Sequence, residues 1–389
     1  MLSGNGGRGL TLIGATNNLA QGNFIGTDSS GAIPLGNSLE GVALWGNAQN
    51  NFVGLALDGS GSGNIIAFNS NAGLAVFDTN TAGNTFRGNR AYNNGALSID
   101  LVGGTENSFG VTLNDPGDLV AGPNHLRNFP VLTNATTAGA FTTLAGSLDS
   151  VANRDFLIDF YAGTNASASG HGPVQFYLGS LPVRTAANGR ADFISGLPAG
   201  SATRHFTTTT TDLLTGDTSE LGGNRVTIAA TAGTPVITTA PVGLTSMIGA
   251  TVNFSVTATG SGLLYQWRHA GTNLPGATAA TLTLTNVQFT QAGGYAVVVR
   301  NASGFTASPV VLLDLMAAMP LLTGPLVLDA TGFSIGLTLE VGRHYRVQFS
   351  QNLITWTDLT NFTAERMSTI IRDPAATNAT RRFYRAVTP

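Results

Sequence analysis

The sequence predicts an all-β protein in which a parallel β-helix is followed by three tandem β-sandwich domains. Four segments in the first hundred residues align position by position: GLTLI at 9–13, GVALW at 41–45, GLAVF at 73–77 and SIDLV at 98–102. Apolar residues recur at alternate positions in each segment, which places them on one face of a strand. A short strand of this kind buries its apolar face only by stacking on its neighbours, so the repetition predicts a solenoid.

The composition supports the same fold class. Only 10% of the 389 residues are charged and 50 are glycine, a balance that favours short strands and turns over long helices. The net charge of −3 argues against bulk nucleic-acid binding. The chain has no cysteine and therefore neither disulfides nor thiolate metal sites. No apolar run reaches the length of a transmembrane segment.

The alignment also fixes which side chains should face the interior. Two interior columns are expected, one of Leu10, Val42, Leu74 and Ile99 and one of Leu12, Leu44, Val76 and Leu101. Two further columns should face outward, one of Thr11, Ala43, Ala75 and Asp100 and one of Ile13, Trp45, Phe77 and Val102. Recurring asparagines are expected to stack between turns and to satisfy backbone groups at the corners: Asn23, Asn51, Asn64, Asn84 and Asn89.

These segments, with GNFIGTDSSGAIPLGN at 22–37 and DPGDLVAGPNHLRNFPVL at 115–132, resemble the right-handed parallel β-helix repeat proteins that bacteria export. The resemblance covers residues 1–133 and implies an extracellular or cell-surface location. The start, MLSGNGGRGL, carries no signal peptide, so we expect the β-helix to be truncated, with a leader and further turns missing. The family has no single activity, and some of its members are polysaccharide lyases or hydrolases.

Three further domains are expected downstream. Alternating stretches in 134–230 predict a β-sandwich. Residues 233–315 resemble an immunoglobulin-like domain, in which Trp267 takes the place of the buried tryptophan and Tyr295 that of the tyrosine corner. Val256 and Val297 stand where that domain has its two cysteines, so the resemblance implies the same core without the disulfide. Residues 317–389 resemble a fibronectin-like module found at the C-termini of exported bacterial proteins.

One loop is a candidate metal site. NDPGD at 114–118 is similar to an acidic Ca²⁺ loop, with Asn114, Asp115 and Asp118 as its ligands. Val120 occupies a position where related loops have another aspartate, and a hard cation needs six or more oxygen ligands. A plain turn is therefore the alternative, and no other cofactor is expected.

The outward columns carry the candidate functional residues. Catalysis on a β-helix needs acids on adjacent turns, and Asp100 is alone in its column, so we assign no catalytic residue and expect a protein that is not an enzyme. Trp45 and Phe77 could form a flat platform for sugar rings, beside a column (Thr11, Ala43, Ala75) small enough for a polymer to lie close. Alternatively, the two aromatic side chains add to the core.

The predicted function is surface display or adhesion, through binding of an extracellular polysaccharide or another cell-surface component. A polysaccharide lyase or glycoside hydrolase is one alternative, and a structural stalk is another. No nucleic-acid partner and no transmembrane segment are expected.

Overall fold

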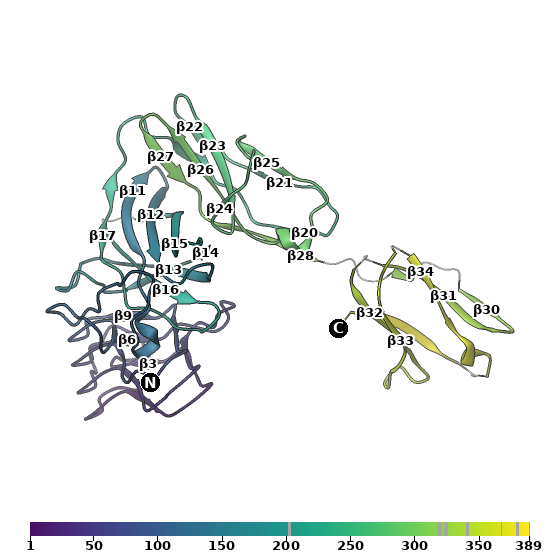
Figure 1. Cartoon of the computed structure of the whole chain (residues 1–389), viewed down its shortest axis with the longest axis horizontal. Helices are drawn as coiled ribbons and strands as arrows, with labels where there is room; N and C mark the ends of the chain where they lie inside the picture. The colour runs from purple at the N-terminus through teal and green to yellow at the C-terminus, as the bar shows by residue number, and fades with distance from the viewer. Residues whose placement is uncertain are drawn as a thin grey trace. The chain divides into compact units, whose positions relative to one another are not determined.

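The computed structural model describes residues 1–200, 204–316, 321–322, 326–339, 342–366, 368–378 and 381–388. In this part of the chain nearly all regular structure is β-strand (Figure 1), which confirms the predicted all-β class. The chain divides into two compact units. The first comprises Met1–Gly243, Asn253–Leu282 and Gly293–Leu312, and the second comprises Leu244–Val252, Thr283–Ala292 and Leu313–Pro389.

Residues 1–102, which the structure describes in full, form three parallel sheets and are called the N-terminal stack here. The first sheet has the order β1 (Leu10–Ile13), β4 (Val42–Trp45), β7 (Leu74–Val76), β10 (Ile99–Leu101). The second is β2 (Leu19–Ala20), β5 (Phe52–Gly54), β8 (Thr85–Arg87), and the third is β3 (Phe24–Ile25), β6 (Ile65–Ala67), β9 (Arg90–Tyr92). Successive turns of the chain thus supply successive strands to each sheet.

The predicted register of the first sheet is confirmed. Val42 pairs with Leu10 on one side and with Leu74 on the other, and Leu74 pairs with Ile99. Because side chains alternate along a strand, this pairing stacks the apolar side chains of successive turns in the interior. The side chains of the two middle turns are almost fully buried there: Val42, Leu44, Leu74 and Val76.

Rows of asparagine side chains join the turns at three corners of the N-terminal stack. Asn51 shows the pattern: its Nδ2 donates to Oδ1 of Asn84 at 2.9 Å and to the carbonyl of Ala15 at 2.9 Å, and its backbone N–H donates to Asn84 Oδ1 at 3.1 Å. The rows are Asn5–Asn37–Asn69–Asn94, Asn18–Asn51–Asn84 and Asn23–Asn64–Asn89. The predicted stacking role of the asparagines is therefore confirmed, and the row that begins at Asn5 adds a third corner.

Residues 131–200 and 204–229 form two facing sheets, called the middle sandwich here. One has the order β15 (Arg190–Pro198), β12 (Phe141–Asp149), β11 (Val131–Ala138), β18 (Ile228–Ala229). The other is β14 (Phe176–Arg184), β13 (Asp155–Gly163), β16 (His205–Asp212), β17 (Arg225–Val226). A buried cluster fills the space between them, with Leu144, Phe156, Ile158, Phe160 and Phe193 among its members.

The middle sandwich and the segment 212–224 close the last turn of the N-terminal stack. The backbone N–H of Phe86 in β8 donates to Thr218 Oγ1 at 3.0 Å, and Val174 N–H donates to the carbonyl of Ala91 in β9 at 2.9 Å. A fully buried ion pair joins Arg87 Nε to Asp159 Oδ2 at 2.8 Å. These contacts pair strand edges that would otherwise be open to other chains.

The predicted core of the immunoglobulin-like segment is also confirmed. The side chain of Trp267 is fully buried in β23 (Leu264–His269), and its indole Nε1–H donates to the Ala279 carbonyl at 2.9 Å. Trp267 pairs with Val297 of β26 (Gly293–Asn301), and Val256 is buried as well. Val256 lies between β21 (Val252–Ser255) and β22 (Thr257–Thr259), which pair with β25 (Thr281–Leu284) and β19 (Val236–Thr239), so the two valines belong to different sheets.

The second unit contains the C-terminal strands. In one sheet β31 (Gly332–Thr338) pairs with β30 (Val327–Asp329), β34 (Ser368–Asp373) and β29 (Leu321–Leu322). In another, β32 (His344–Ser350) pairs with β33 (Thr357–Thr363) and β35 (Phe383–Val387). Their core includes Ile335, Leu337, Tyr345 and Val347. The four-domain division stays a prediction, and its last boundary, at 317, lies outside the described residues.

Candidate functional site

The outward face of the first sheet holds the two residues predicted to bind a polymer. Trp45 ends β4 and Phe77 follows β7, and the parallel pairing brings their rings to 6.2 Å between centroids. Both side chains are half-buried. The ring planes meet at 79°, edge to face, which is a favourable geometry for an aromatic pair. The expectation of a flat platform is therefore wrong, although one part of each ring remains accessible.

Arg8 fixes this aromatic pair from the neighbouring turn. Its guanidinium carbon lies 4.5 Å from the centroid of the Trp45 ring and 6.0 Å from that of Phe77. Its Nε donates to Oε2 of Glu40 at 2.6 Å, while Oε1 of Glu40 accepts a hydrogen bond from Asn71 Nδ2 at 2.7 Å. Cation–π attraction and a charge-assisted hydrogen bond thus hold the arginine across the sheet face.

The small outward column is buried in the two middle turns. Ala43 and Ala75 are 0% and 1% exposed, so the expected space for a polymer directly above them is absent in this described part of the chain. Thr11, in the first turn of the same column, is exposed. A ligand on this side would contact the rings, the arginine and the polar groups around it.

Asp100 belongs to the same outward column, in the last strand of the sheet. Its side chain is half-buried and has no hydrogen-bond or ion-pair partner among the described residues. Burial, together with the negative charges of Glu106 and Glu40, raises the pKa of Asp100 to about 7. A carboxyl group with this pKa can exchange a proton near neutral pH, which is a property of many catalytic acids and bases.

Glu220 is a second acid near this strand, and sequence reasoning missed it. Its Oε1 accepts the backbone N–H of Leu101 at 2.9 Å and its Oε2 that of Thr112 at 3.0 Å. Burial, with a smaller contribution from the charge of Asp100, raises the pKa of Glu220 to about 8. Glu220 lies outside the aligned repeats, and its place in DLLTGDTSELGGN (212–224) was the only available signal.

The side chains of the candidate Ca²⁺ loop already form hydrogen bonds with other groups of the protein. Asp118 is buried, and its Oδ2 accepts hydrogen bonds from Arg127 Nη1 at 2.9 Å and Ser150 Oγ at 2.5 Å. Asp115 Oδ2 accepts the N–H of Leu119 at 2.7 Å, and Asn114 pairs with the backbone of Phe129. Among the described residues no group of three acidic, histidine or cysteine side chains is placed to hold a metal. A cation at Asp118 would have to displace Arg127.

A histidine that the sequence did not single out forms a dyad with a buried acid. His125 Nδ1 lies 2.8 Å from Asp217 Oδ2, and this hydrogen bond raises the pKa of His125. Asp217 Oδ1 also accepts the N–H of Gly83 at 2.5 Å, which ties the dyad to the N-terminal stack. An open groove beside His125 is lined in part by amide side chains, including those of Asn47, Gln49 and Asn80. The hydroxyl groups of Thr79 and Thr215 also line the groove, and among the described residues no hydrogen bond joins either of them to His125.

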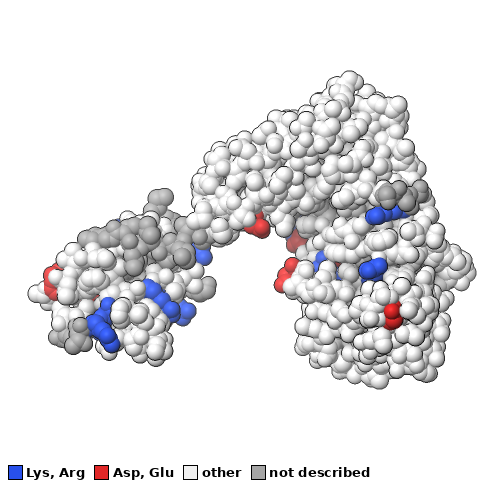
Figure 2. All heavy atoms as spheres, turned by 180° about the vertical axis from the view of Figure 1, so that it is seen from behind, with Lys and Arg blue, Asp and Glu red and all other residues white. Residues whose placement is uncertain are grey.

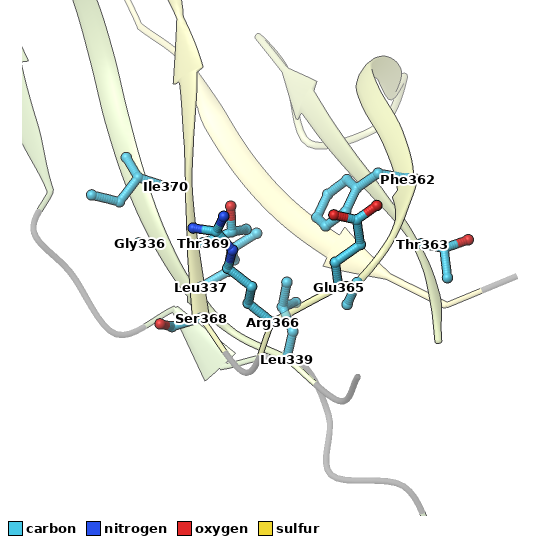
Figure 3. Close-up of a pocket in the computed structure, with 11 residues that line it drawn as sticks. Gly336, Leu337, Leu339, Phe362, Thr363, Glu365, Arg366, Ser368, Thr369 and Ile370 are labelled. Atoms are coloured by element: carbon cyan, nitrogen blue, oxygen red, sulfur yellow. The ribbon is translucent and has the colours of Figure 1, made fainter. Parts of the chain in front are cut away.

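The surface charge and the pocket of the second unit provide no further candidate site among the described residues. On the face shown in Figure 2, acidic and basic side chains are few and most of the surface is uncharged. A pocket of about 740 Å³ in the second unit is lined by residues such as Leu337, Phe362, Glu365 and Arg366 (Figure 3).

No protein-family model and no curated protein matches the chain. Similar solved structures include the tandem Ig repeats of Dlar, at 17% identity and a TM-score of 0.28, which cover 49% of this chain and 100% of that chain. The Ig1-2 module of the Drosophila receptor protein tyrosine phosphatase DLAR matches at 16% identity and a TM-score of 0.26, with 49% and 100% covered. A chimeric titin Z1Z2 matches at 24% identity and a TM-score of 0.20, with 22% and 96% covered. Similarities of this size support no functional argument. In the described residues no helix has the length and hydrophobicity to span a bilayer.

Proposed function

We propose that this chain is an exported surface protein whose N-terminal stack, a right-handed parallel β-helix, binds an extracellular polysaccharide. The observation that carries the proposal is the half-exposed Trp45–Phe77 pair, held in place by Arg8 on the outward face of the first sheet. The domains that follow the stack act as spacers or anchors in adhesion.

The chemistry of the face suits a sugar polymer. Aromatic rings contact the apolar faces of sugars, and the neighbouring Arg8, Glu40 and Asn71 offer hydrogen-bond donors and acceptors for hydroxyl groups. Successive strands of a parallel sheet lie about 4.8 Å apart, close to the repeat of a pyranose unit in an extended glycan. A polymer that runs across the turns would therefore place about one sugar unit over each successive strand.

Replacing both rings tests the proposal. Trp45→Ala with Phe77→Ala should weaken binding in affinity electrophoresis against a panel of neutral and acidic polysaccharides by about tenfold or more, which corresponds to about 1.4 kcal/mol. Phe289→Ala is the matched control, because Phe289 is an exposed aromatic residue of the second unit and does not belong to this sheet face. Circular dichroism would verify that each variant remains folded. Equal binding by the double variant and the wild type would refute the proposal.

The pKa of Asp100 favours a second candidate, a glycoside hydrolase or polysaccharide lyase that uses this residue as its acid or base. In that case the chain would release reducing ends from one of the same polysaccharides, and Asp100→Asn would abolish the release while preserving binding. If the wild-type protein binds a polysaccharide and releases no product from it, the result would exclude the enzyme for that polysaccharide and support adhesion.

A further inference from the structure

A cavity of about 430 Å³ lies between the last turn of the N-terminal stack and the loop that joins β13 to β14. Residues 93–98 form one wall, residues 165–175 contribute most of the other, and Phe109 lies at the rim with 53% of its surface exposed. The volume is within the range of pockets that enclose small organic ligands. All of these segments belong to the first unit and are described in full.

The lining of this cavity is polar without being charged. It consists of amides, hydroxyl groups, a histidine and small or apolar residues, and no acidic or basic side chain of the described chain other than that histidine contributes to it. A charged ligand would therefore lose its hydration without gaining an ionic partner, which is costly. The cavity selects for a neutral ligand.

Several polar groups in the cavity remain available for such a ligand. The amides of Asn93 and Asn165 make no hydrogen bond to other described residues. Gln175 uses its Oε1 to accept from the N–H and Oγ1 of Thr164, at 2.8 and 2.9 Å, which leaves Nε2 as a donor. His171 Nδ1 lies 2.6 Å from the carbonyl of Leu221 and must donate to it, so Nε2 is an acceptor when the ring is neutral.

From these features we infer that the cavity is a binding site for a neutral saccharide unit, separate from the Trp45–Phe77 face. A sugar offers a dense set of hydroxyl groups that both donate and accept, matching the mixed amide and imidazole groups of the walls. The exposed ring of Phe109 provides an apolar surface for one face of the sugar at the rim. The inference rests on the cavity alone and does not require that the outward face bind a polymer.

The test uses the full chain and five named probes: D-glucose, D-galactose, D-mannose, N-acetyl-D-glucosamine and, as the charged counterpart, D-glucuronate. Saturation-transfer NMR and calorimetry should show saturable binding of at least one neutral sugar and weaker or no binding of D-glucuronate. Asn165→Ala combined with Gln175→Ala should weaken that binding about tenfold or more, and Phe109→Ala should weaken it as well. Melting curves would verify that these exposed or half-exposed positions tolerate the change.

Two controls separate this site from others. Phe289→Ala removes a phenylalanine of similar exposure, 49%, in the second unit and should leave sugar binding unchanged. Trp45→Ala with Phe77→Ala should also leave it unchanged, whatever its effect on polysaccharides. The inference is overturned if no neutral sugar binds, if the cavity variants bind as tightly as the wild type, or if binding is lost only in the Trp45 and Phe77 variant.

Discussion

The carboxylate of Glu220 accepts the backbone N–H of Leu101 at 2.9 Å, at the edge of the last strand in the first sheet. In a longer stack this N–H would pair with the carbonyl of the next strand. A side chain from the loop between β16 and β17 therefore supplies the acceptor that a further strand would otherwise provide. The same carboxylate accepts the N–H of Thr112 at 3.0 Å, so a single residue satisfies two backbone donors.

Removing Glu220 should destabilise the first unit. Glu220→Ala leaves two backbone N–H groups without their acceptor, and each unsatisfied buried donor costs about 1–3 kcal/mol. Urea unfolding at pH 6, where the carboxyl group is mostly protonated, would measure the loss. Glu365→Ala, at an exposed position of the second unit, is the control and should change stability little. An unchanged unfolding midpoint for Glu220→Ala would show that water satisfies these donors.

Asp100 should make stability fall as the pH rises. The pKa of Asp100 is raised from 3.8 to about 7 in the folded chain, so the folded state binds a proton that the unfolded state has already released. The resulting stabilisation is fully present below about pH 4 and is lost as the pH rises through 7. Asp100→Asn should therefore resemble the wild type at pH 4 and exceed its stability at pH 9. Equal differences in unfolding free energy at both pH values would contradict the raised pKa.

Calcium should have little effect on the melting temperature. The Asp118 oxygens already accept hydrogen bonds from Arg127, Ser150 and the backbone N–H of Asn128, whereas a site saturated at a hundred times its dissociation constant would add about 2.7 kcal/mol. Asp118→Ala should lower stability by about 3 kcal/mol, with or without calcium, because it breaks a buried ion pair. A calcium-dependent rise of several degrees that Asp118→Ala removes would establish the site after all.

Trp267 should be a main determinant of the stability of the immunoglobulin-like segment. Its side chain is fully buried and pairs with Val297, so Trp267→Ala should cost about 3–5 kcal/mol. The half-buried Trp356, which lies 4.2 Å from the guanidinium carbon of Arg385, provides a control with the same substitution and a smaller loss. Calorimetry that resolves separate transitions is the suitable measurement, because a chain of several domains does not unfold in two states. Similar losses for both tryptophans would argue against a special role for the core position.

The features predicted correctly are those that depend on local periodicity. Alternating apolar residues fix the pairing of Val42 with Leu74, since a shift by one residue would expose every interior side chain. The burial of Trp267 and its pairing with Val297 follow in the same way from the spacing of strands. In both cases the local pattern of apolar residues is compatible with only one strand register.

The site could be predicted only in part, because its decisive contacts join distant turns. The proximity of Trp45 and Phe77 follows from the strand register. The position of Arg8 over their rings depends on its hydrogen bond to Glu40. Glu40 precedes a strand, so the alternation of apolar residues along the strands does not predict this contact. Asp100 looked isolated because its column holds no other acid. The pKa of Asp100 is raised by burial and by the charges of Glu106 and Glu40, which lie outside that column. Glu220, whose own pKa the charge of Asp100 helps to raise, is 119 residues from Leu101 in sequence.

The asparagine rows have a consequence for how this molecule can change in length. Neighbouring members of a row are separated by 25 residues between Asn64 and Asn89 but by 41 between Asn23 and Asn64, and the amide contact is the same in both cases, at 2.9 and 3.0 Å. The asparagine contacts therefore fix the position at which the chain re-enters each corner. They do not fix the number of residues between one contact and the next. Insertions at the exposed tips of the loops, 29–30 and 58–61, should be tolerated without repacking of the interior. These tips can therefore diverge, or be exchanged by design, while the scaffold that presents them stays the same.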